Sequence, residues 1–212
     1  MKPIAIALLA FDGMEALDFA GPFEVFTTAA RVWAKWHASE NGAATAISHC
    51  EEPLFDVKTV ARALGPVQAR AGLRVLPDAD FSAPWQADLL LVPGGVVDEA
   101  MACPHTLDWV RRQHTASRWT ASVCTGAFVL AAAGVLTQGR VTTHWEDQAD
   151  LQRQFPALDV VGGVRWVEQG RVTTSAGISA GIAMSLHLVA TMAQAQGPVS
   201  YTHLTLPTKR IV

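Results

Sequence analysis

The chain has 212 residues, of which half are hydrophobic, and a formal net charge of −3. This length suffices for one domain with a full core and is short for two. No run of Lys or Arg is present, so we expect neither a nucleic acid nor an anionic membrane as the main partner.

Short apolar runs alternate with helical patterns along the chain, which predicts an α/β fold, a flavodoxin-like three-layer sandwich with a mostly parallel sheet. In the first half we expect, in order, a strand at Ile4–Phe11, a helix at Pro22–Ala38, a strand at Ala44–His49, a hairpin at Val67–Leu76 and a strand at Asp88–Val92. In the second half we expect a helix at Pro104–Thr115, a strand at Trp119–Val123, a helix at Gly126–Ala133, a hairpin at Val164–Thr174 and a helix at Ile182–Gln194.

The pattern ends near Gly197. Residues 1–196 are predicted to form one domain, whereas residues 197–212 follow neither a helical nor a strand period and form an irregular tail. We expect this tail to be disordered or foreign to the domain.

The three cysteines, at positions 50, 103 and 124, share no metal-ligand spacing and cannot all pair. A disulfide framework is therefore not expected. No segment reaches the roughly 18 apolar residues of a membrane span. Together these features predict a cytoplasmic protein.

Cys124 is the strongest candidate for a nucleophilic residue. It lies in SVCTG, residues 122–126, where a predicted strand is followed without a spacer by a predicted helix. Such a junction is a nucleophile elbow at the carboxyl end of a parallel strand, where open α/β sheets bind ligands. Because a helix amino end favours an anion, we expect a lowered thiol pKa and a nucleophilic thiolate. The alternative is a buried cysteine that fills a gap in the core.

Gly94 and Gly95 follow the predicted strand that ends at Val92. Their backbone N–H groups can stabilise a developing negative charge, as in an oxyanion hole. An ordinary exit from strand to loop is the alternative interpretation.

Asp18 and His144 are the candidate proton carriers. Asp18 lies between apolar neighbours just before the expected helix start, so it can be a helix cap or a carboxyl group tuned for proton transfer. His144 lies near a predicted strand end beside Trp145, where it can be a base or a packed structural residue.

The strings LDFAGP, VPGG, SVCTGAFVLAAAGVL, GRVTTHW and SAGISAGI follow one another in this chain. Over about residues 3 to 195 the sequence resembles the DJ-1/PfpI family, within the class I glutamine amidotransferase-like group. Inside that family it resembles isonitrile hydratases and the amino-terminal domains of AraC-type transcription regulators.

The resemblance implies a homodimer that acts on a small molecule. It implies that Cys124 and Asp18 act as a pair, with Thr125 contributing, to hydrate an isonitrile to an N-substituted formamide. Gly94, Gly95 and His144 would then bind or orient the substrate. This chemistry needs no metal and no organic cofactor.

Three other activities are considered beside this one. A ligand-sensing domain related to AraC-type regulators would keep the pocket without turnover. A DJ-1-like glyoxalase or deglycase fits the Asp18 and Cys124-Thr125 pattern less well. A peptidase is disfavoured, because the residue after Cys124 is Thr125 rather than the histidine of PfpI-like peptidases.

Overall fold

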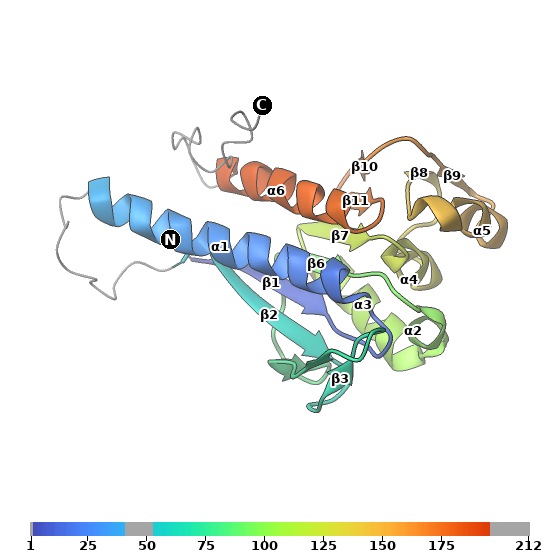
Figure 1. Ribbon diagram of the computed structural model, residues 1–212, viewed down its shortest axis with the longest axis horizontal. Coiled ribbons are helices and arrows are strands. Elements are labelled where there is room, and N and C mark those ends of the chain that lie inside the picture. The colour runs from blue at the N-terminus through green and yellow to red at the C-terminus, as the bar shows by residue number, and fades with distance from the viewer. Residues whose placement is uncertain (1, 41–52, 196–212) are drawn as a thin grey trace.

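The computed structural model describes residues 2–40 and 53–195 as an α/β fold around a seven-stranded sheet (Figure 1). The sheet has the order β10-β11-β7-β6-β1-β2-β5 and is parallel except for the β10–β11 hairpin. Its strands are β1 (Ile4–Leu9), β2 (Phe55–Ala61), β5 (Ala79–Asp80), β6 (Leu89–Val92), β7 (Trp119–Val123), β10 (Trp166–Gln169) and β11 (Val172–Ser175).

The central strands are apolar because both of their faces are covered. Every residue of β1 and β6 is buried, as expected for parallel strands with helices on each side. Two small two-stranded sheets flank the main one: β3 (Val67–Gln68) with β4 (Arg74–Val75), and β8 (Gly139–Val141) with β9 (Leu158–Val160).

The helices form the two outer layers. α1 (Ala16–Glu40) leads from β1 to β2, whereas α2 (Asp98–Ala102) and α3 (Pro104–Ala116) lead from β6 to β7 in the opposite direction across the sheet. Because such crossovers are right-handed, these helices belong on opposite faces. α6 (Ser179–Gln194) packs beside α1, and α4 (Gly126–Ala132) packs with α2 and α3 (Figure 1).

The strand order reverses between β1 and β6. At such a switch point the loops that follow the strands separate and leave room at the carboxyl edge of the sheet. The segments after β1, β6 and β7 carry Asp18, Gly94 and Cys124 respectively. The fold therefore brings together three segments that are distant in sequence.

The predicted fold class is confirmed. The expected strand Ala44–His49 lies outside the described residues, as does the predicted tail 197–212. The strand beside β1 is β2, which the sequence analysis missed because Asp56 and Lys58 interrupt its apolar pattern.

The predicted starts of two helices were too late. α1 begins at Ala16, so Pro22 lies inside the helix instead of at its first turn. α6 begins at Ser179 rather than Ile182, and Gly181 in its first turn packs closely on β7: a Cβ there would lie 2.4 Å from Val123 Cγ1. The short elements η1 (Trp145–Asp147) and α5 (Gln148–Gln154), together with β8 and β9, were also missed.

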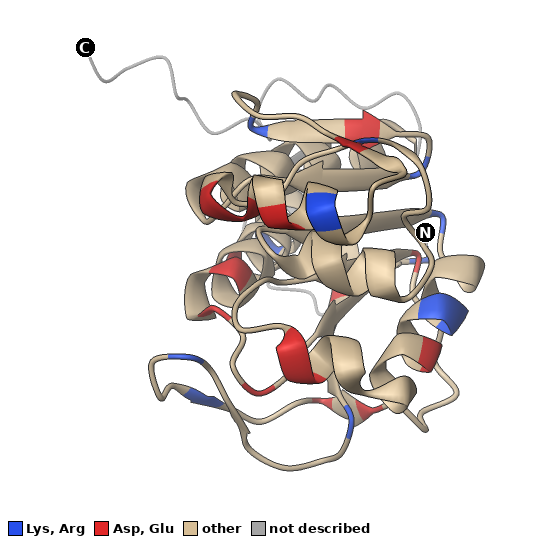
Figure 2. Ribbon diagram, turned by 90° about the vertical axis from the view of Figure 1, so that its right-hand side faces the viewer, with Lys and Arg blue, Asp and Glu red and all other residues tan. Residues whose placement is uncertain are grey.

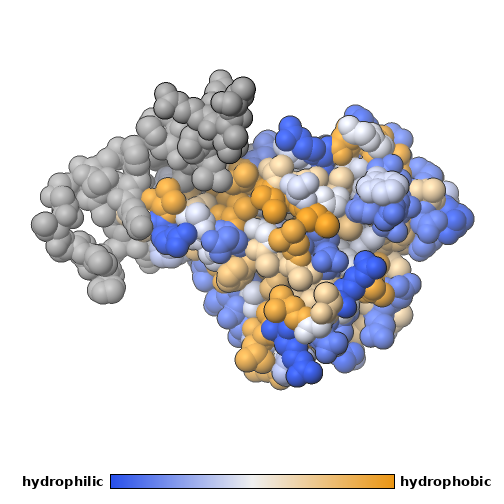
Figure 3. All heavy atoms as spheres, viewed as in Figure 1, coloured by the Kyte–Doolittle hydropathy of each residue, from blue (hydrophilic) through white to orange (hydrophobic). Residues whose placement is uncertain are grey.

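The surface carries dispersed charge, and apolar residues gather on one face. Figure 2 shows Lys and Arg residues scattered among Asp and Glu residues on the side that faces the viewer. Figure 3 shows apolar residues gathered near the centre of the face covered by α1 and α6. In the described part of the chain, no helix is long and apolar enough to cross a membrane.

Candidate functional site

Cys124 lies on a strained turn between β7 and α4. Its φ of +55° belongs to the left-handed region, which non-glycine residues adopt rarely and at a cost of about 1–3 kcal/mol. Two backbone contacts hold it there: its N–H donates to Ser175 O at 3.1 Å, and its C=O accepts from Thr143 Oγ1 at 2.8 Å. The geometry is that of the predicted elbow.

Glycines let the neighbouring backbone approach this turn. A Cβ on Gly94 would lie 2.7 Å from Cys124 Cβ, and one on Gly126 would lie 2.4 Å from Val92 O. Real Cβ atoms do not tolerate such distances, so both positions require glycine. The loop after β6 therefore lies directly against Cys124.

Thr125 fastens that loop. Its Oγ1 donates to Gly95 O at 2.8 Å and accepts from the Gly95 N–H at 2.8 Å. The N–H of Gly94 is turned toward the Asp18 carboxyl group and lowers its pKa. The Gly95 N–H, which the sequence suggested as an oxyanion donor, thus has a partner inside the protein, and the Gly94 N–H lies close to Asp18.

Asp18 is completely buried in the first turn of α1. Its Oδ1 accepts a hydrogen bond from the Ile178 N–H at 3.2 Å, while its Oδ2 has no partner by hydrogen-bond geometry among the described residues. Because it accepts from a distant segment and lies inside the helix, Asp18 is not a helix cap, which was one of its two interpretations from the sequence. An unpartnered buried carboxylate oxygen is costly and marks a functional position.

Burial dominates the electrostatics of Asp18. It raises the pKa of the carboxyl group from 3.8 to about 6, although the nearby Cys124 thiol and the N–H groups of Ile178 and Gly94 favour the charged form and oppose the rise. The negative charge of Glu15 adds to it. A carboxyl group with a pKa near 6 can both accept and return a proton close to neutral pH.

The prediction of a lowered thiol pKa is wrong for Cys124. Burial, followed by the charge of Asp18, raises the pKa of the thiol to about 12, and Asp147 adds a smaller contribution. The Thr125 N–H at the start of α4 acts in the expected direction but is outweighed. The free protein therefore holds a neutral thiol beside a carboxylate.

His144 lies on the segment that follows Thr143. Its Nδ1 is 3.4 Å from Asp147 Oδ2 and 3.6 Å from Glu146 Oε2, and it accepts from the Glu146 N–H at 3.4 Å. A Cβ on Gly177 would lie 2.4 Å from His144 Cδ2. The imidazole is thus held between a short acidic turn and the loop before α6, and no hydrogen bond joins it to Cys124.

Sequence reasoning missed several residues that build the site. Thr143 and Asp147 lie near Cys124, and Ile178 contributes an N–H from a left-handed conformation with a φ of +42°. A β-branched residue in that region is a true outlier and marks a strained position. The strings GRVTTHW and SAGISAGI contain Thr143 and Ile178. Nothing in either string indicated a role for these two residues.

The segments that carry the site residues also expose large apolar side chains. Four exposed large side chains are sequence neighbours of site residues or site residues themselves: Leu17, Val96, Trp145 and Ile178. Trp145 is 71% exposed, which is unusual for so large an apolar group. Within the described residues, no cluster of three or more His, Cys, Asp or Glu side chains is arranged to hold a metal ion.

A cysteine on a strained strand-to-helix turn, with a buried acid beside it at the carboxyl edge of a parallel sheet, defines an α/β protein of the nucleophile-elbow class. The DJ-1/PfpI family model matches residues 4–191. The chain belongs to that family, which confirms the resemblance found in its sequence.

The similar proteins include both an enzyme and a transcriptional regulator. The chain is 33% identical over 186 residues to isonitrile hydratase of Pseudomonas putida, a match that covers 87% of this chain and 70% of that protein. It is 34% identical over 134 residues to the HTH-type transcriptional regulator CdhR of Pseudomonas aeruginosa, covering 63% of this chain and 39% of the regulator.

A solved structure shows the same architecture. The ThiJ/PfpI family protein from Pseudomonas syringae superposes with a TM-score of 0.72 at 27% identity, over 92% of this chain and 73% of that one.

Proposed function

We propose that this protein hydrates an isonitrile to an N-substituted formamide, with Cys124 as the nucleophile and Asp18 as the acid and base. The observation that carries the proposal is the buried Asp18 carboxyl group coupled to the Cys124 thiol, with Oδ2 lacking a hydrogen-bond partner among the described residues. The likeness to isonitrile hydratase supports the choice of substrate.

The first step joins sulfur to carbon. At neutral pH Asp18 is largely ionised and Cys124 is protonated, because their pKa values are about 6 and about 12. The sulfur attacks the terminal carbon of the isonitrile as the thiol proton passes to Asp18. Asp18 then gives that proton to the same carbon, which leaves a thioimidate with a new S–C bond and a new C–H bond.

The second step consumes water. Asp18 accepts a proton from water as the oxygen adds to the thioimidate carbon, and the nitrogen takes up that proton. The C–S bond then breaks, the hydroxyl proton of the adduct returns to sulfur through Asp18, and the formamide leaves. One water is consumed and Cys124 is regenerated.

The other site residues would orient these groups. Thr125 holds Gly95, and the adjoining Gly94 N–H faces Asp18, so the loop after β6 sets the direction of the carboxyl group. His144 would form part of the substrate-binding wall. We propose that the exposed apolar side chains of Leu17, Val96, Trp145 and Ile178, which flank site residues in the sequence, contact the alkyl or aryl substituent on the isonitrile nitrogen.

A ligand-sensing role is the second candidate, and the match to the regulator CdhR favours it. In that case the site around Cys124 would bind a small molecule without turnover. For either function we propose a homodimer and a cytoplasmic location. A DJ-1-like activity on glyoxals is the third candidate function.

The test is to incubate purified protein with cyclohexyl isocyanide and follow N-cyclohexylformamide by proton NMR. We expect turnover in the wild type and in the matched control Cys103→Ser, and none in Cys124→Ala. Absence of formamide from folded wild-type protein, or equal turnover in Cys124→Ala, would overturn the proposal. Stoichiometric binding of the isonitrile without product would instead favour the sensing role.

A further inference from the structure

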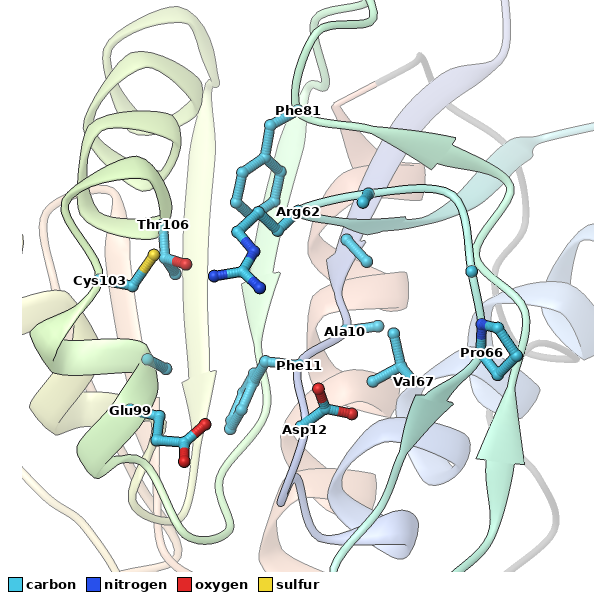
Figure 4. A pocket seen from close by; sticks show the side chains of 14 residues that line it. Ala10, Phe11, Asp12, Arg62, Pro66, Val67, Phe81, Glu99, Cys103 and Thr106 are labelled. Carbon is cyan, nitrogen blue, oxygen red and sulfur yellow. The ribbon is translucent and has the colours of Figure 1, made fainter.

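A cavity of about 240 Å³ lies away from Cys124, at the carboxyl ends of β1 and β2 (Figure 4). The segments after those two strands form one side of it, and the start of α3 with part of α2 forms the other. Neither Cys124 nor Asp18 lines it. The proposed hydration leaves this cavity without a role.

Arg62 supplies a positive charge to the cavity. It follows β2, and its guanidinium points into the open space between the two walls (Figure 4). It forms no ion pair within the described residues, and it lies within hydrogen-bonding reach of the Cys103 thiol. A guanidinium group presents a planar fork of donors that matches a carboxylate.

Two carboxylates face the same space. Asp12 follows β1, and Glu99 lies on α2. Asp12 Oδ1 accepts the Gln68 N–H at 2.8 Å, and neither carboxylate makes an ion pair in the described part of the chain. Three charged side chains of both signs thus line one cavity and do not neutralise one another. A ligand with only a negative charge would meet both carboxylates, and one with only a positive charge would meet Arg62.

Most of the remaining wall is apolar, and its aromatic rings are held in place by packing. Phe11 is buried, and the ring of Phe81 stacks on that of Trp109 with centroids 4.8 Å apart and an interplanar angle of 14°. Val67 and Pro66 close the side formed by the loop after β2. The volume is below the range of about 300–1,000 Å³ for typical ligand pockets, so the occupant must be small.

We propose that this cavity binds a small α-amino acid as its zwitterion, with the carboxylate on Arg62, the ammonium group on Asp12 and Glu99, and an apolar side chain against Phe11. Cys103 lies on the wall formed by α2 and α3, opposite Phe11, and the bound amino acid covers its thiol. This site is separate from the one that holds Cys124, and the proposal does not depend on isonitrile hydration.

The test measures binding to the full chain by isothermal titration calorimetry. The probes are L-alanine, L-valine, L-leucine and L-methionine, each at up to about 5 mM, which detects dissociation constants in the millimolar range. Two analogues of leucine serve as controls: 4-methylpentanoate lacks the ammonium group and 3-methylbutylamine lacks the carboxylate. The variants are Arg62→Gln and Glu99→Gln, with Arg74→Gln as an exposed arginine outside the cavity.

We expect at least one amino acid to bind one-to-one and both leucine analogues to bind at least about ten-fold more weakly than leucine, as expected for the loss of a charge-assisted pair. Arg62→Gln should weaken binding by about ten-fold or more, and Arg74→Gln should not. Bound amino acid should also slow alkylation of Cys103 by iodoacetamide.

Absence of binding by all four amino acids would overturn the proposal. It would also be overturned if 3-methylbutylamine bound as tightly as leucine, or if Arg74→Gln weakened binding as much as Arg62→Gln.

Discussion

The Asp18 carboxyl group and the Cys124 thiol are buried side by side, and each changes the pKa of the other. The thiol donates toward the carboxylate and lowers its pKa, whereas the carboxylate raises that of the thiol. The pair therefore keeps its proton on sulfur until a substrate arrives. This arrangement suits a reaction in which the same proton must later reach carbon.

Asp18→Asn should make the folded protein more stable at neutral pH while it abolishes turnover. The rise of the Asp18 pKa from 3.8 to about 6 corresponds to about 3 kcal/mol that ionisation of the buried group costs the folded state at neutral pH. Asparagine keeps an oxygen for the Ile178 N–H but carries no charge. We expect the free energy of unfolding at pH 7 to increase by about 1–3 kcal/mol in urea titrations.

The stabilisation of Asp18→Asn relative to wild type should disappear in acid. The folded state holds the Asp18 proton more tightly than the unfolded state does. In the wild type, the contribution of Asp18 to the free energy of unfolding is therefore fully present below about pH 4 and is lost as the pH rises through about 6. The advantage of Asp18→Asn should therefore vanish near pH 4. Asp150→Asn on the surface is the matched control. An equal difference between Asp18→Asn and wild type at pH 4 and pH 7 would contradict this assignment.

The rate of isonitrile hydration should fall in acid with an apparent pKa near 6. Protonated Asp18 cannot accept the thiol proton, so kcat/KM should drop about ten-fold for each pH unit below that value. Initial rates between pH 4.5 and 8 with cyclohexyl isocyanide provide the measurement. A flat profile down to pH 4.5 would show that Asp18 is not the base.

Cys103, rather than Cys124, should be the more rapidly alkylated of the two described cysteines in the free protein. The pKa of Cys103 is lowered, chiefly by hydrogen bonding from Thr106, and its side chain is partly exposed. Cys124 is buried and its thiol pKa is raised to about 12. From the sequence we expected a lowered thiol pKa for Cys124, because that argument considered the helix amino end without the burial.

Iodoacetamide labelling at pH 7.5, followed by peptide mass spectrometry, measures both cysteines in one sample. We expect Cys103 to react at least about ten-fold faster, since the thiolate is the reacting form. Thr106→Val should slow Cys103 without affecting Cys124. Faster labelling of Cys124 would mean that Asp18 takes its proton even without substrate.

Much of the fold was predictable because its signals are local. The apolar run of β1, the junction between Val123 and Gly126 and the hairpin of β10 and β11 each follow from adjacent residues. β2 was missed because its charged residues, Asp56 and Lys58, lie at half-buried positions within the strand. The start of α1 was missed because Pro22 is a good first-turn residue, yet upstream residues such as Asp18 and Phe19 are buried and extend the helix.

The site was predictable in its members and less so in their roles. Cys124, Asp18, Thr125 and Gly94 do meet, because the switch point brings the ends of β1, β6 and β7 together. The direction of the thiol pKa depends on burial and on Asp18 and Asp147, which are distant in sequence. The cavity at Arg62 was not predicted at all, since no single motif contains Asp12, Arg62 and Glu99.

Thr125→Val should loosen the loop after β6 and lower activity more than it lowers stability. Valine has nearly the same shape but can neither donate to Gly95 O nor accept from the Gly95 N–H, so both 2.8 Å contacts are lost. We expect about 1–3 kcal/mol of lost stability from the unpaired peptide groups. Gly94 would then move, and with it the N–H that orients Asp18, so kcat should fall by about ten-fold or more.

Thr125→Ser keeps the hydroxyl group and should retain most of the activity. Urea titration and turnover of cyclohexyl isocyanide, measured on both variants, test the assignment; a valine variant with wild-type kcat would show that Thr125 does not position the site.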